Sequence, residues 1–381
     1  VLTTLNQFEE ADNFGSLINP AATNPGGALQ ALSQKNMEGE MFLTGTHDLV
    51  LSALRQAEYL SRRYHVVVAN PPYMGGSNMN PKLSAYLKEN YSDVKSDLFS
   101  AFIVRNTELA VKQGQLGFMS PYVWMFISSY EKLRALLINQ KTITSLIQLE
   151  YSGFDGATVP ICTFTLENRH KPNFKGAYIR LSDFRGAANQ APKTLEAIRN
   201  PDCGWFYRVS TDEFQKIPGS PIAYWASKKV LQLFGYQTPL SRLLETREGM
   251  TTGSNETFLR FWYEISLSNI GFKIKNINES IESRKYFFPY IKGGEFRRWA
   301  GNYEYIVNWY NDGQYLKRFQ DHITGRVRSH NYNGEYAFKT GLTWSGLTSG
   351  SFSVRHVPQG FKFDAKGPMG FPFDYDMQFL Y

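Results

Sequence analysis

The first half of the chain alternates between stretches with helical spacing of apolar residues and short, continuously apolar runs. A helix is predicted from Thr46 or Asp48, either of which could cap it, to about Arg63. Its apolar positions are Leu49, Leu51, Leu54, Ala57 and Leu60. The run that ends at Ala69 follows directly and predicts a buried strand over 65–69. This step from helix to strand is typical of an α/β sheet.

Similar alternation continues to about residue 182. It predicts helices over 82–90, 97–112 and 129–139, and strands over 114–121, 142–149, 160–167 and 176–181. We expect the last two strands to form an antiparallel edge of the sheet. Residues 183–220 lose this periodicity, and a helix over 222–235 is expected to connect to the second part of the chain. Residues 1–45 are polar and predict a partly ordered lead-in.

Polar chemistry enters where the strand over 65–69 ends, at Asn70-Pro71-Pro72-Tyr73. Two consecutive prolines cannot continue a ladder of hydrogen bonds, so they hold Asn70 and Tyr73 on a stiff turn. The Asn70 side-chain carbonyl and the Pro71 backbone carbonyl could each accept one N–H of an amine on a planar ring, while Tyr73 stacks on the ring. Asn has no acid–base capacity at neutral pH, so this is an orienting and polarising site.

Asn70-Pro71-Pro72-Tyr73 after a buried strand resembles the catalytic motif of the amino-group methyltransferases, which use S-adenosylmethionine and mostly methylate N6 of adenine in DNA. The resemblance implies that Asn70, Pro71, Pro72 and Tyr73 are catalytic. The positively charged sulfonium already activates the methyl group, so no metal is expected. Asp97-Leu98-Phe99 also resembles the sequence that follows this motif in the family, where the Asp and the aromatic residue lie near the base and the cofactor. Taken alone, Asp97 is better explained as a helix cap.

Composition adds a mild basic character. The 381 residues carry 41 Lys and Arg against 34 Asp and Glu, which fits a polyanionic partner. The length favours two domains. Cys162 and Cys203 match no metal or redox spacing and are expected to be reduced, and no stretch is apolar enough to cross a membrane. We therefore expect a cytoplasmic protein without a membrane partner.

From about residue 240 the chain becomes rich in aromatic residues beside arginines. Such a segment after a methyltransferase core is typical of a DNA target-recognition domain, and the alternative is an accessory domain with solvated charges. Its candidate DNA-binding residues are Arg247, Thr252, Asn255, Arg297 and Arg298. Residues 249–263, 302–312, 343–345 and 360–364 resemble the long adenine methyltransferases of phage defence, notably the BREX type. The partners would then be double-stranded DNA and other phage-defence proteins.

The cofactor half of such an enzyme is not evident in the sequence. The family binds S-adenosylmethionine through a Gly-rich turn after its first strand, and no strand followed by such a turn occurs before residue 65. Gly26 and Gly27 lie in a polar stretch and are poor candidates. Because the chain also starts at Val1 without an initiating Met, we expect part of a longer enzyme that binds the cofactor weakly and shows little turnover alone.

The expected fold class is therefore α/β: a partial class I S-adenosylmethionine-dependent methyltransferase core, comprising the C-terminal half of its sheet, plus a mixed α/β target-recognition domain. The expected divisions are a lead-in over 1–45, the partial core over 46–220, a linker helix over 221–240 and the start of the recognition domain over 241–381. Two alternatives remain open for the function. One is methylation of a glutamine amide or of adenine in RNA, and the other is a non-catalytic DNA-recognition subunit.

Overall fold

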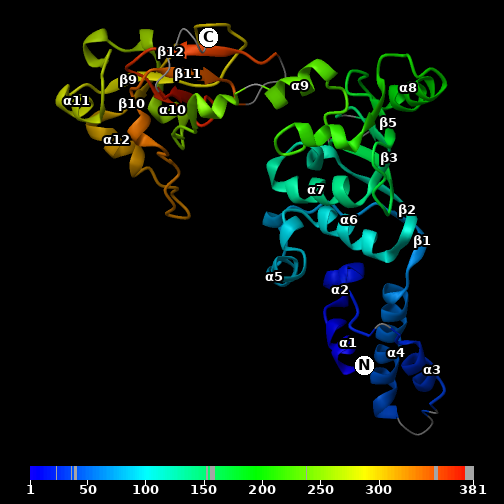
Figure 1. Ribbon diagram of the computed structural model, residues 1–381. Helices are drawn as coiled ribbons and strands as arrows, with labels where there is room; N and C mark the ends of the chain where they lie inside the picture. The colour runs from blue at the N-terminus through cyan, green and yellow to red at the C-terminus, as the bar shows by residue number, and fades with distance from the viewer. Residues whose placement is uncertain are drawn as a thin grey trace. The chain divides into compact units, whose positions relative to one another are not determined.

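The computed structural model describes residues 1–373 except 23, 36, 38–40, 152, 155–158, 237 and 347–350. The chain divides into two compact units, Val1–Gln237 and Thr238–Tyr381 (Figure 1). The last residues of the expected recognition domain, 374–381, lie outside the described part.

Unit 1 is built on a six-stranded mixed sheet with the order β1-β2-β4-β3-β5-β6. Its strands are β1 (Tyr64–Ala69), β2 (Ala110–Pro121), β3 (Thr142–Gln148), β4 (Ile161–Glu167), β5 (Lys175–Arg180) and β6 (Phe206–Ser210). β1 pairs parallel with β2, and β3 pairs parallel with β5. The other neighbours are antiparallel. β1 thus forms one edge of the sheet, and its carboxyl end leads into the turn at Asn70.

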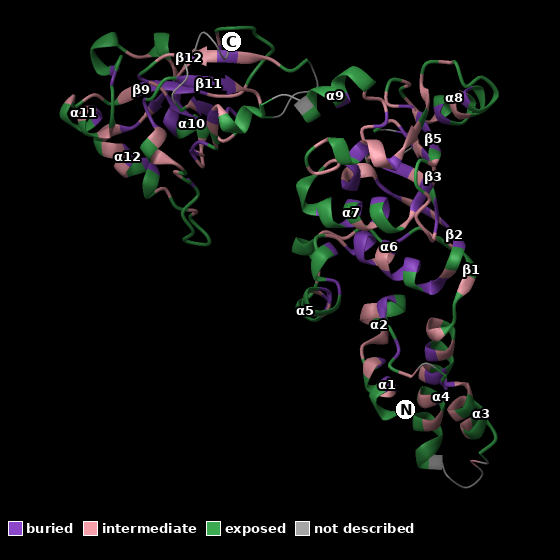
Figure 2. Cartoon of the chain, viewed as in Figure 1, coloured by how far each residue is buried: buried purple, intermediate pink, exposed green. Residues whose placement is uncertain are grey.

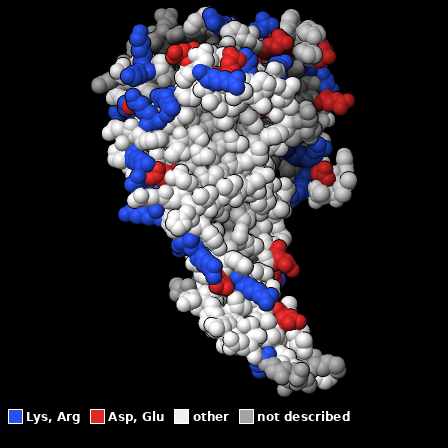
Figure 3. Space-filling view, turned by 90° about the vertical axis from the view of Figure 1, so that its right-hand side faces the viewer, with Lys and Arg blue, Asp and Glu red and all other residues white. Residues whose placement is uncertain are grey.

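The helices of unit 1 are α1 (Leu2–Gln7), α2 (Ala11–Phe14), α3 (Gly26–Ser33), α4 (Met41–Ser61), α5 (Pro81–Asn90), α6 (Leu98–Leu109), α7 (Glu131–Gln140), α8 (Ala187–Arg199) and α9 (Lys228–Tyr236). α6 and α7 cover one face of the sheet (Figure 1). Their buried residues, such as Phe99, Ile103 and Leu137, join Leu116, Phe164 and other strand residues in the main core (Figure 2). The opposite face is open at β1, where Val66 and Val68 are exposed. The prediction of a buried strand over 65–69 was therefore wrong in its burial: no residue of β1 is buried, because the strand lies at the edge of the sheet. Figure 3 shows a broad area there without charged side chains.

The arrangement of the two strands expected at an antiparallel edge differs from the prediction. β4 lies between β2 and β3 in the sheet interior, and β5 is parallel to β3. β4 is buried at Ile161, Cys162, Phe164 and Leu166, and only Thr165 is exposed. Burial of most positions of a strand is typical of the sheet interior, since an edge strand usually carries exposed charged residues at alternate positions. The antiparallel edge is formed by β6.

Two segments that seemed irregular in sequence are more ordered than expected, and one expected helix is shorter. Residues 183–220 contain α8 and β6; α8 was obscured because it carries Pro192 and buries only Gln190 and Ala197. The connecting helix starts at Lys228 instead of residue 222, since Ile222 and Tyr224 are buried in the main core as irregular backbone. The ring of Tyr224 stacks on that of Tyr178, with 4.9 Å between ring centroids.

The second segment that is more ordered than expected is the lead-in over 1–45, which contains α1, α2, α3 and the start of α4. The buried guanidinium of Arg105 on α6 connects it to the sheet unit. Arg105 donates to the backbone carbonyls of Ser16 (3.2 Å), Ile18 (2.9 Å) and Leu60 (2.9 Å). The buried guanidinium of Arg105 thus supplies hydrogen-bond donors to backbone carbonyls that have no partner within a helix. These hydrogen bonds help to order a segment that has no apolar periodicity.

Unit 2 contains two four-stranded sheets, β13-β9-β10-β8 and β12-β11-β14-β7. Its strands are β7 (Leu244–Arg247), β8 (Leu259–Phe261), β9 (Phe287–Ile291), β10 (Tyr305–Asn308), β11 (Gly341–Trp344), β12 (Val354–Val357), β13 (Lys362–Phe363) and β14 (Met369–Pro372). Its helices are α10 (Asn255–Phe258), α11 (Ile277–Glu282) and α12 (Tyr310–Lys317). An aromatic-rich core that includes Phe288, Tyr290 and Trp309 lies against the first sheet.

Candidate functional site

The turn after β1 presents the side chains of Asn70 and Tyr73 at the surface. Pro71 is buried and fixes the turn, whereas Asn70 is exposed and Tyr73 is 38% exposed. Tyr73 Oη donates a hydrogen bond to Asn70 Oδ1 over 3.0 Å. Burial raises the pKa of the Tyr73 phenol, so the hydroxyl keeps its proton and remains a donor at neutral pH. The pair is thus held together as a neutral, preorganised unit.

The carboxylate of Asp97 fixes the next part of the turn. Asp97 Oδ1 accepts from the backbone N–H of Met74 (3.0 Å) and from that of Phe99 (3.3 Å), where it is the N-cap of α6. The N–H of Leu98 in turn donates to the Met74 carbonyl (3.0 Å). Burial raises the pKa of Asp97, and the backbone donors oppose that rise. Asp97 therefore caps a helix and positions the turn at once.

The ring of Tyr73 packs against buried aromatic rings. Its ring meets the fully buried ring of Phe99 edge-on, with 6.4 Å between centroids, and Phe99 packs against Tyr130 at 5.5 Å. Burial and the nearby Asp97 raise the pKa of Tyr130 to about 12. Because one side of Tyr73 rests on this stack and part of the ring is exposed, the phenol can offer a flat surface to a ligand.

The carbonyl groups needed to hold an amine are present at the same turn. A carbonyl oxygen has two lone pairs, so Asn70 Oδ1 can accept a second donor beside the Tyr73 hydroxyl. Within the described part of the chain, the Pro71 carbonyl accepts no hydrogen bond. A shallow hollow lies beside the turn and is lined by Val68, Ala69, Asn70 and residues of β2, β3 and β4. Asn70 is the residue of the motif that lines this hollow.

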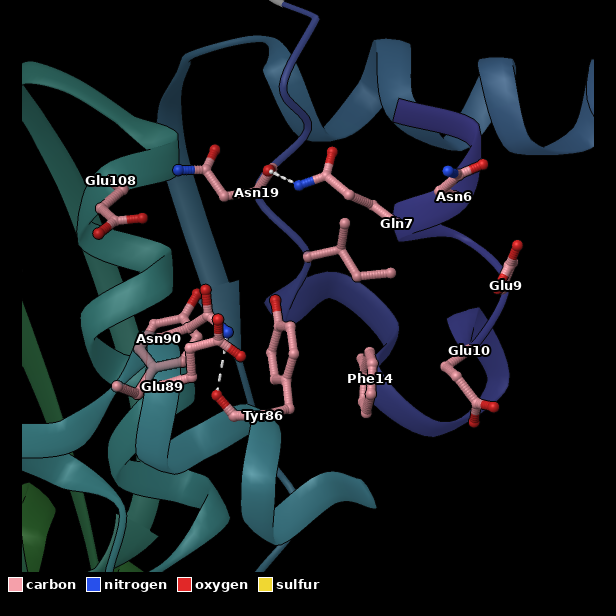
Figure 4. Close-up of a pocket in the computed structure, with 12 residues that line it drawn as sticks. Asn6, Gln7, Glu9, Glu10, Phe14, Asn19, Tyr86, Glu89, Asn90 and Glu108 are labelled. Atoms are coloured by element: carbon pink, nitrogen blue, oxygen red, sulfur yellow. Dashed lines mark hydrogen bonds between the residues drawn. The ribbon is translucent and has the colours of Figure 1, made fainter. Parts of the chain in front are cut away.

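A second hollow in unit 1 has different chemistry (Figure 4). Four glutamates, Glu9, Glu10, Glu89 and Glu108, line it together with Phe14, whose ring stacks on Tyr86. Such an acidic lining repels phosphates, so we do not assign it to a nucleic acid.

The described residues do not form a complete cradle for S-adenosylmethionine. Before β1 they form the helices α1 to α4, and Gly26 and Gly27 begin α3 instead of following a strand. The resemblance makes Asp97 and Phe99 weak candidates for cofactor binding. Phe99 is fully buried, and the Asp97 carboxylate accepts hydrogen bonds from the backbone N–H groups of Met74 and Phe99. The described residues fit the side of a site that would hold the amine.

The candidate DNA-binding residues of unit 2 fall into two groups. Asn255, Arg297 and Arg298 are exposed. Thr252 is buried and donates to Asn255 Oδ1 (2.8 Å), and Arg247 contacts Glu245 and Tyr336. Arg247 and Thr252 therefore already have partners inside the unit.

One exposed basic segment escaped the sequence analysis, namely a hairpin over residues 319–328. The sequence feature that could have predicted it is Asp321 followed by Thr324-Gly325, a combination typical of a tight turn. One arginine, Arg318, precedes this turn, and two, Arg326 and Arg328, follow it. Among the described residues no group of three or more His, Cys, Asp or Glu side chains could hold a metal ion. Nor does any described helix combine the length and hydropathy needed to cross a membrane.

The partial mixed sheet with an exposed Asn-Pro-Pro-Tyr turn at its edge strand defines the class of the protein as a class I methyltransferase fold. Residues 16–154 match the family model described as the Eco57I restriction-modification methylase. This segment is thus similar to the methylases of that restriction-modification family.

Two curated proteins are similar over most of the chain. The adenine-specific methyltransferase PglX of Lacticaseibacillus casei (strain Zhang) is 40% identical over 326 residues, which are 84% of this chain and 27% of that protein. The adenine-specific methyltransferase BrxX of Escherichia coli O9:H4 (strain HS) is 33% identical over 373 residues, which are 96% of this chain and 29% of that protein. These similarities confirm the resemblance inferred from the motifs. The chain spans less than a third of the length of either relative.

Among solved structures, that of the Type IIL restriction-modification enzyme MmeI in complex with DNA has a similar fold. The TM-score is 0.53 at 14% identity, and the match covers 85% of this chain and 43% of that one. Because it extends over most of the chain, the match includes residues of both units. At 14% identity it shows a similar fold and nothing more.

Proposed function

We propose that this chain provides the adenine-holding site of a DNA methyltransferase, which transfers a methyl group from S-adenosylmethionine to N6 of an adenine in duplex DNA. The observation that carries the proposal is the exposed Asn70–Tyr73 pair, held by Asp97 at the carboxyl end of β1. Ligands of open α/β sheets bind at such strand ends.

In this proposal the adenine leaves the base stack before it reacts. Extrusion costs a few kcal/mol, and stacking on Tyr73 returns on the order of 1–3 kcal/mol. The two N–H groups of the amine donate to Asn70 Oδ1 and to the Pro71 carbonyl. These contacts turn the lone pair of N6 out of the ring plane and hold it in line for attack, and such alignment supplies much of the rate. Bound S-adenosylmethionine supplies an activated methyl group.

The choice of adenine in DNA rests on the relatives and on unit 2. The two relatives are named adenine-specific methyltransferases, and MmeI was solved with DNA. Unit 2 exposes Arg297 and Arg298, which we assign to DNA contacts together with Asn255. The proposal includes a role in phage defence or restriction-modification, in the cytoplasm and with other defence proteins, and the restriction-modification enzyme MmeI supports the second of these roles.

The substrate class can be tested in the source organism by comparing a strain with and without the gene. N6-methyladenine at one recurring DNA sequence, present only with the gene, is the expected result. If the gene instead changes methylation of ribosomal RNA or of protein glutamines, or changes none of the three, the proposal is wrong.

A further inference from the structure

A projecting hairpin of unit 2 has no role in the site described above. Residues 319–328 leave the end of α12 and return as two short antiparallel segments (Figure 1). Gln320 and Val327 form a β-bridge, and the N–H of Arg328 donates to the Phe319 carbonyl over 2.8 Å. The N–H of Asp321 donates to the Arg326 carbonyl, also over 2.8 Å. The hairpin is therefore paired by hydrogen bonds along its length.

The tip of this hairpin has a fixed shape. Asp321 Oδ1 accepts from the N–H groups of Ile323 (3.1 Å) and Thr324 (2.9 Å) and from the Thr324 hydroxyl (3.1 Å). These donors hold the pKa of Asp321 below its ordinary value, so the carboxylate stays ionised and bonded. Gly325 follows at φ +66°, a conformation that glycine adopts readily. The turn thus presents Ile323 in one orientation.

The base of the hairpin is attached to the body of unit 2. The backbone of His330 pairs with that of Thr251 through two hydrogen bonds of 2.8 and 3.1 Å. The ring of Phe319 meets that of Phe258 edge-on, with 5.2 Å between centroids. A force on the tip would therefore be transmitted to a packed core.

The exposed surface of the hairpin combines an apolar tip with positive charge. Ile323 is 95% exposed, more than any other large apolar residue in the described part of the chain. Residues 318–330 carry three arginines and a single carboxylate, and that carboxylate is used in the turn. Among the described residues none of the three arginines forms an ion pair. Each can therefore neutralise a phosphate without breaking an ion pair, and the guanidinium of Arg328 lies over the ring of Phe319, 5.7 Å from its centroid.

We propose that this hairpin is a DNA wedge, in which Arg326 and Arg328 bind backbone phosphates and Ile323 inserts between neighbouring base pairs. The proposal rests on the proposed function, since it presupposes a DNA partner, and adds how the duplex is distorted. Apolar side chains of this kind partly unstack a base step and bend the duplex, and arginines beside them supply the sequence-independent attraction. An isoleucine suits the task because its branched side chain has few rotamers to lose.

Two measurements on the 381-residue chain test this role without knowledge of the target sequence. Fluorescence anisotropy gives the Kd for a mixed-sequence duplex at several salt concentrations. Relaxation of a plasmid by a topoisomerase in the presence of the chain gives the unwinding per bound molecule, because an inserted side chain unwinds DNA. The variants are Ile323→Ala and the double variant Arg326→Ala/Arg328→Ala. The controls are Leu267→Ala and Lys273→Ala/Lys275→Ala, which change exposed residues elsewhere in unit 2.

Ile323→Ala should remove about three-quarters or more of the unwinding and change Kd by about threefold or less. Arg326→Ala/Arg328→Ala should weaken binding about tenfold and lower the slope of log Kd against log salt by about 1.8, which is the release of two counterions. Both controls should behave as the unaltered chain. Unchanged unwinding with Ile323→Ala, unchanged Kd with the double variant, or no duplex binding by the unaltered chain would overturn the wedge. Failure of the proposed function is detected separately, as absence of N6-methyladenine from genomic DNA.

Discussion

Replacing Asp97 separates the architecture of the turn from its chemistry. Asp97→Ala removes the N-cap of α6 and the acceptor for the Met74 N–H, while Asp97→Asn keeps one carbonyl oxygen at the same place. Loss of an N-cap costs about 1 kcal/mol, and a buried N–H without a partner costs about 1–3 kcal/mol more. Asp97→Ala should therefore lower the free energy of unfolding by about 2–4 kcal/mol.

The matched variant should behave differently because burial raises the pKa of Asp97. A raised pKa means that the folded state favours the protonated form. The stability linked to this group is fully present below the pKa of the unfolded chain and is lost as pH rises through the folded pKa. Asn carries no charge to desolvate, and it caps helices about as well as Asp. Asp97→Asn should therefore remain within about 0.5 kcal/mol of the unaltered chain at pH 7.

Urea unfolding followed by tryptophan fluorescence measures the free energies, and amide hydrogen exchange reads the Met74 N–H directly. Asp97→Ala should lose exchange protection at Met74, and Asp97→Asn should keep it. Equal stability of the Ala variant together with an unchanged exchange rate at Met74 would refute the assignment of Asp97 as the residue that positions the turn.

Three further predictions concern the rest of the chain. Arg105→Met should lower the free energy of unfolding by about 3–5 kcal/mol in urea titrations, because three backbone carbonyls lose their donor; a loss below about 1 kcal/mol would contradict this. Lys362 is buried over the Trp309 ring with its pKa lowered to about 7, so stability falls as pH drops from about 10.5 to about 7. Lys362→Met should thus raise the melting temperature at pH 7 and make stability depend less on pH over this range. If the pH dependence of stability is unchanged in the variant, burial of Lys362 is not its cause. Calorimetric titration of this chain with S-adenosylmethionine should give a Kd weaker than about 100 µM; micromolar affinity would show that a cofactor cradle had been missed.

Local patterns were sufficient to predict the elements around the site. The strand before Asn70 was expected over 65–69 and spans Tyr64–Ala69, and the helix expected over 97–112 spans Leu98–Leu109 with Asp97 as its cap. Each of these boundaries has a local cause, namely two prolines in one case and a capping carboxylate in the other. A boundary with such a local cause can be predicted from the sequence.

Features that depend on distant partners were not predictable in the same way. The place of β4 inside the sheet is decided by its two neighbours, although its buried run from Ile161 to Leu166 was a hint. The order of the described residues of the lead-in depends on distant partners, among them Arg105, which donates to the Ser16 carbonyl, and Tyr86 and Tyr91, which donate to the Leu17 carbonyl. The second role of Asp97, on the Met74 N–H, required the turn and the helix to be brought together. The sequence indicated a helix cap and, through the family resemblance, a place near the base and the cofactor, but not this hydrogen bond.

The candidate site was predicted best where its chemistry is contained in one turn. Asn70 and Tyr73 are adjacent to each other in space as the motif implied. In unit 2, charge and aromatic content did not distinguish Arg247, which is used internally, from Arg297 and Arg298, which are exposed. Exposure is a property of the folded unit.

The central claim is that the Asn70 amide oxygen receives the amine of adenine. The most direct measurement is the level of N6-methyladenine in the genome of a deletion strain that carries the gene with Asn70→Ala, with DNA binding by the purified variant as the control. We expect methylation to fall to that of the deletion strain while the Kd for duplex DNA stays within about threefold of the unaltered protein. Methylation at the unaltered level would contradict the claim.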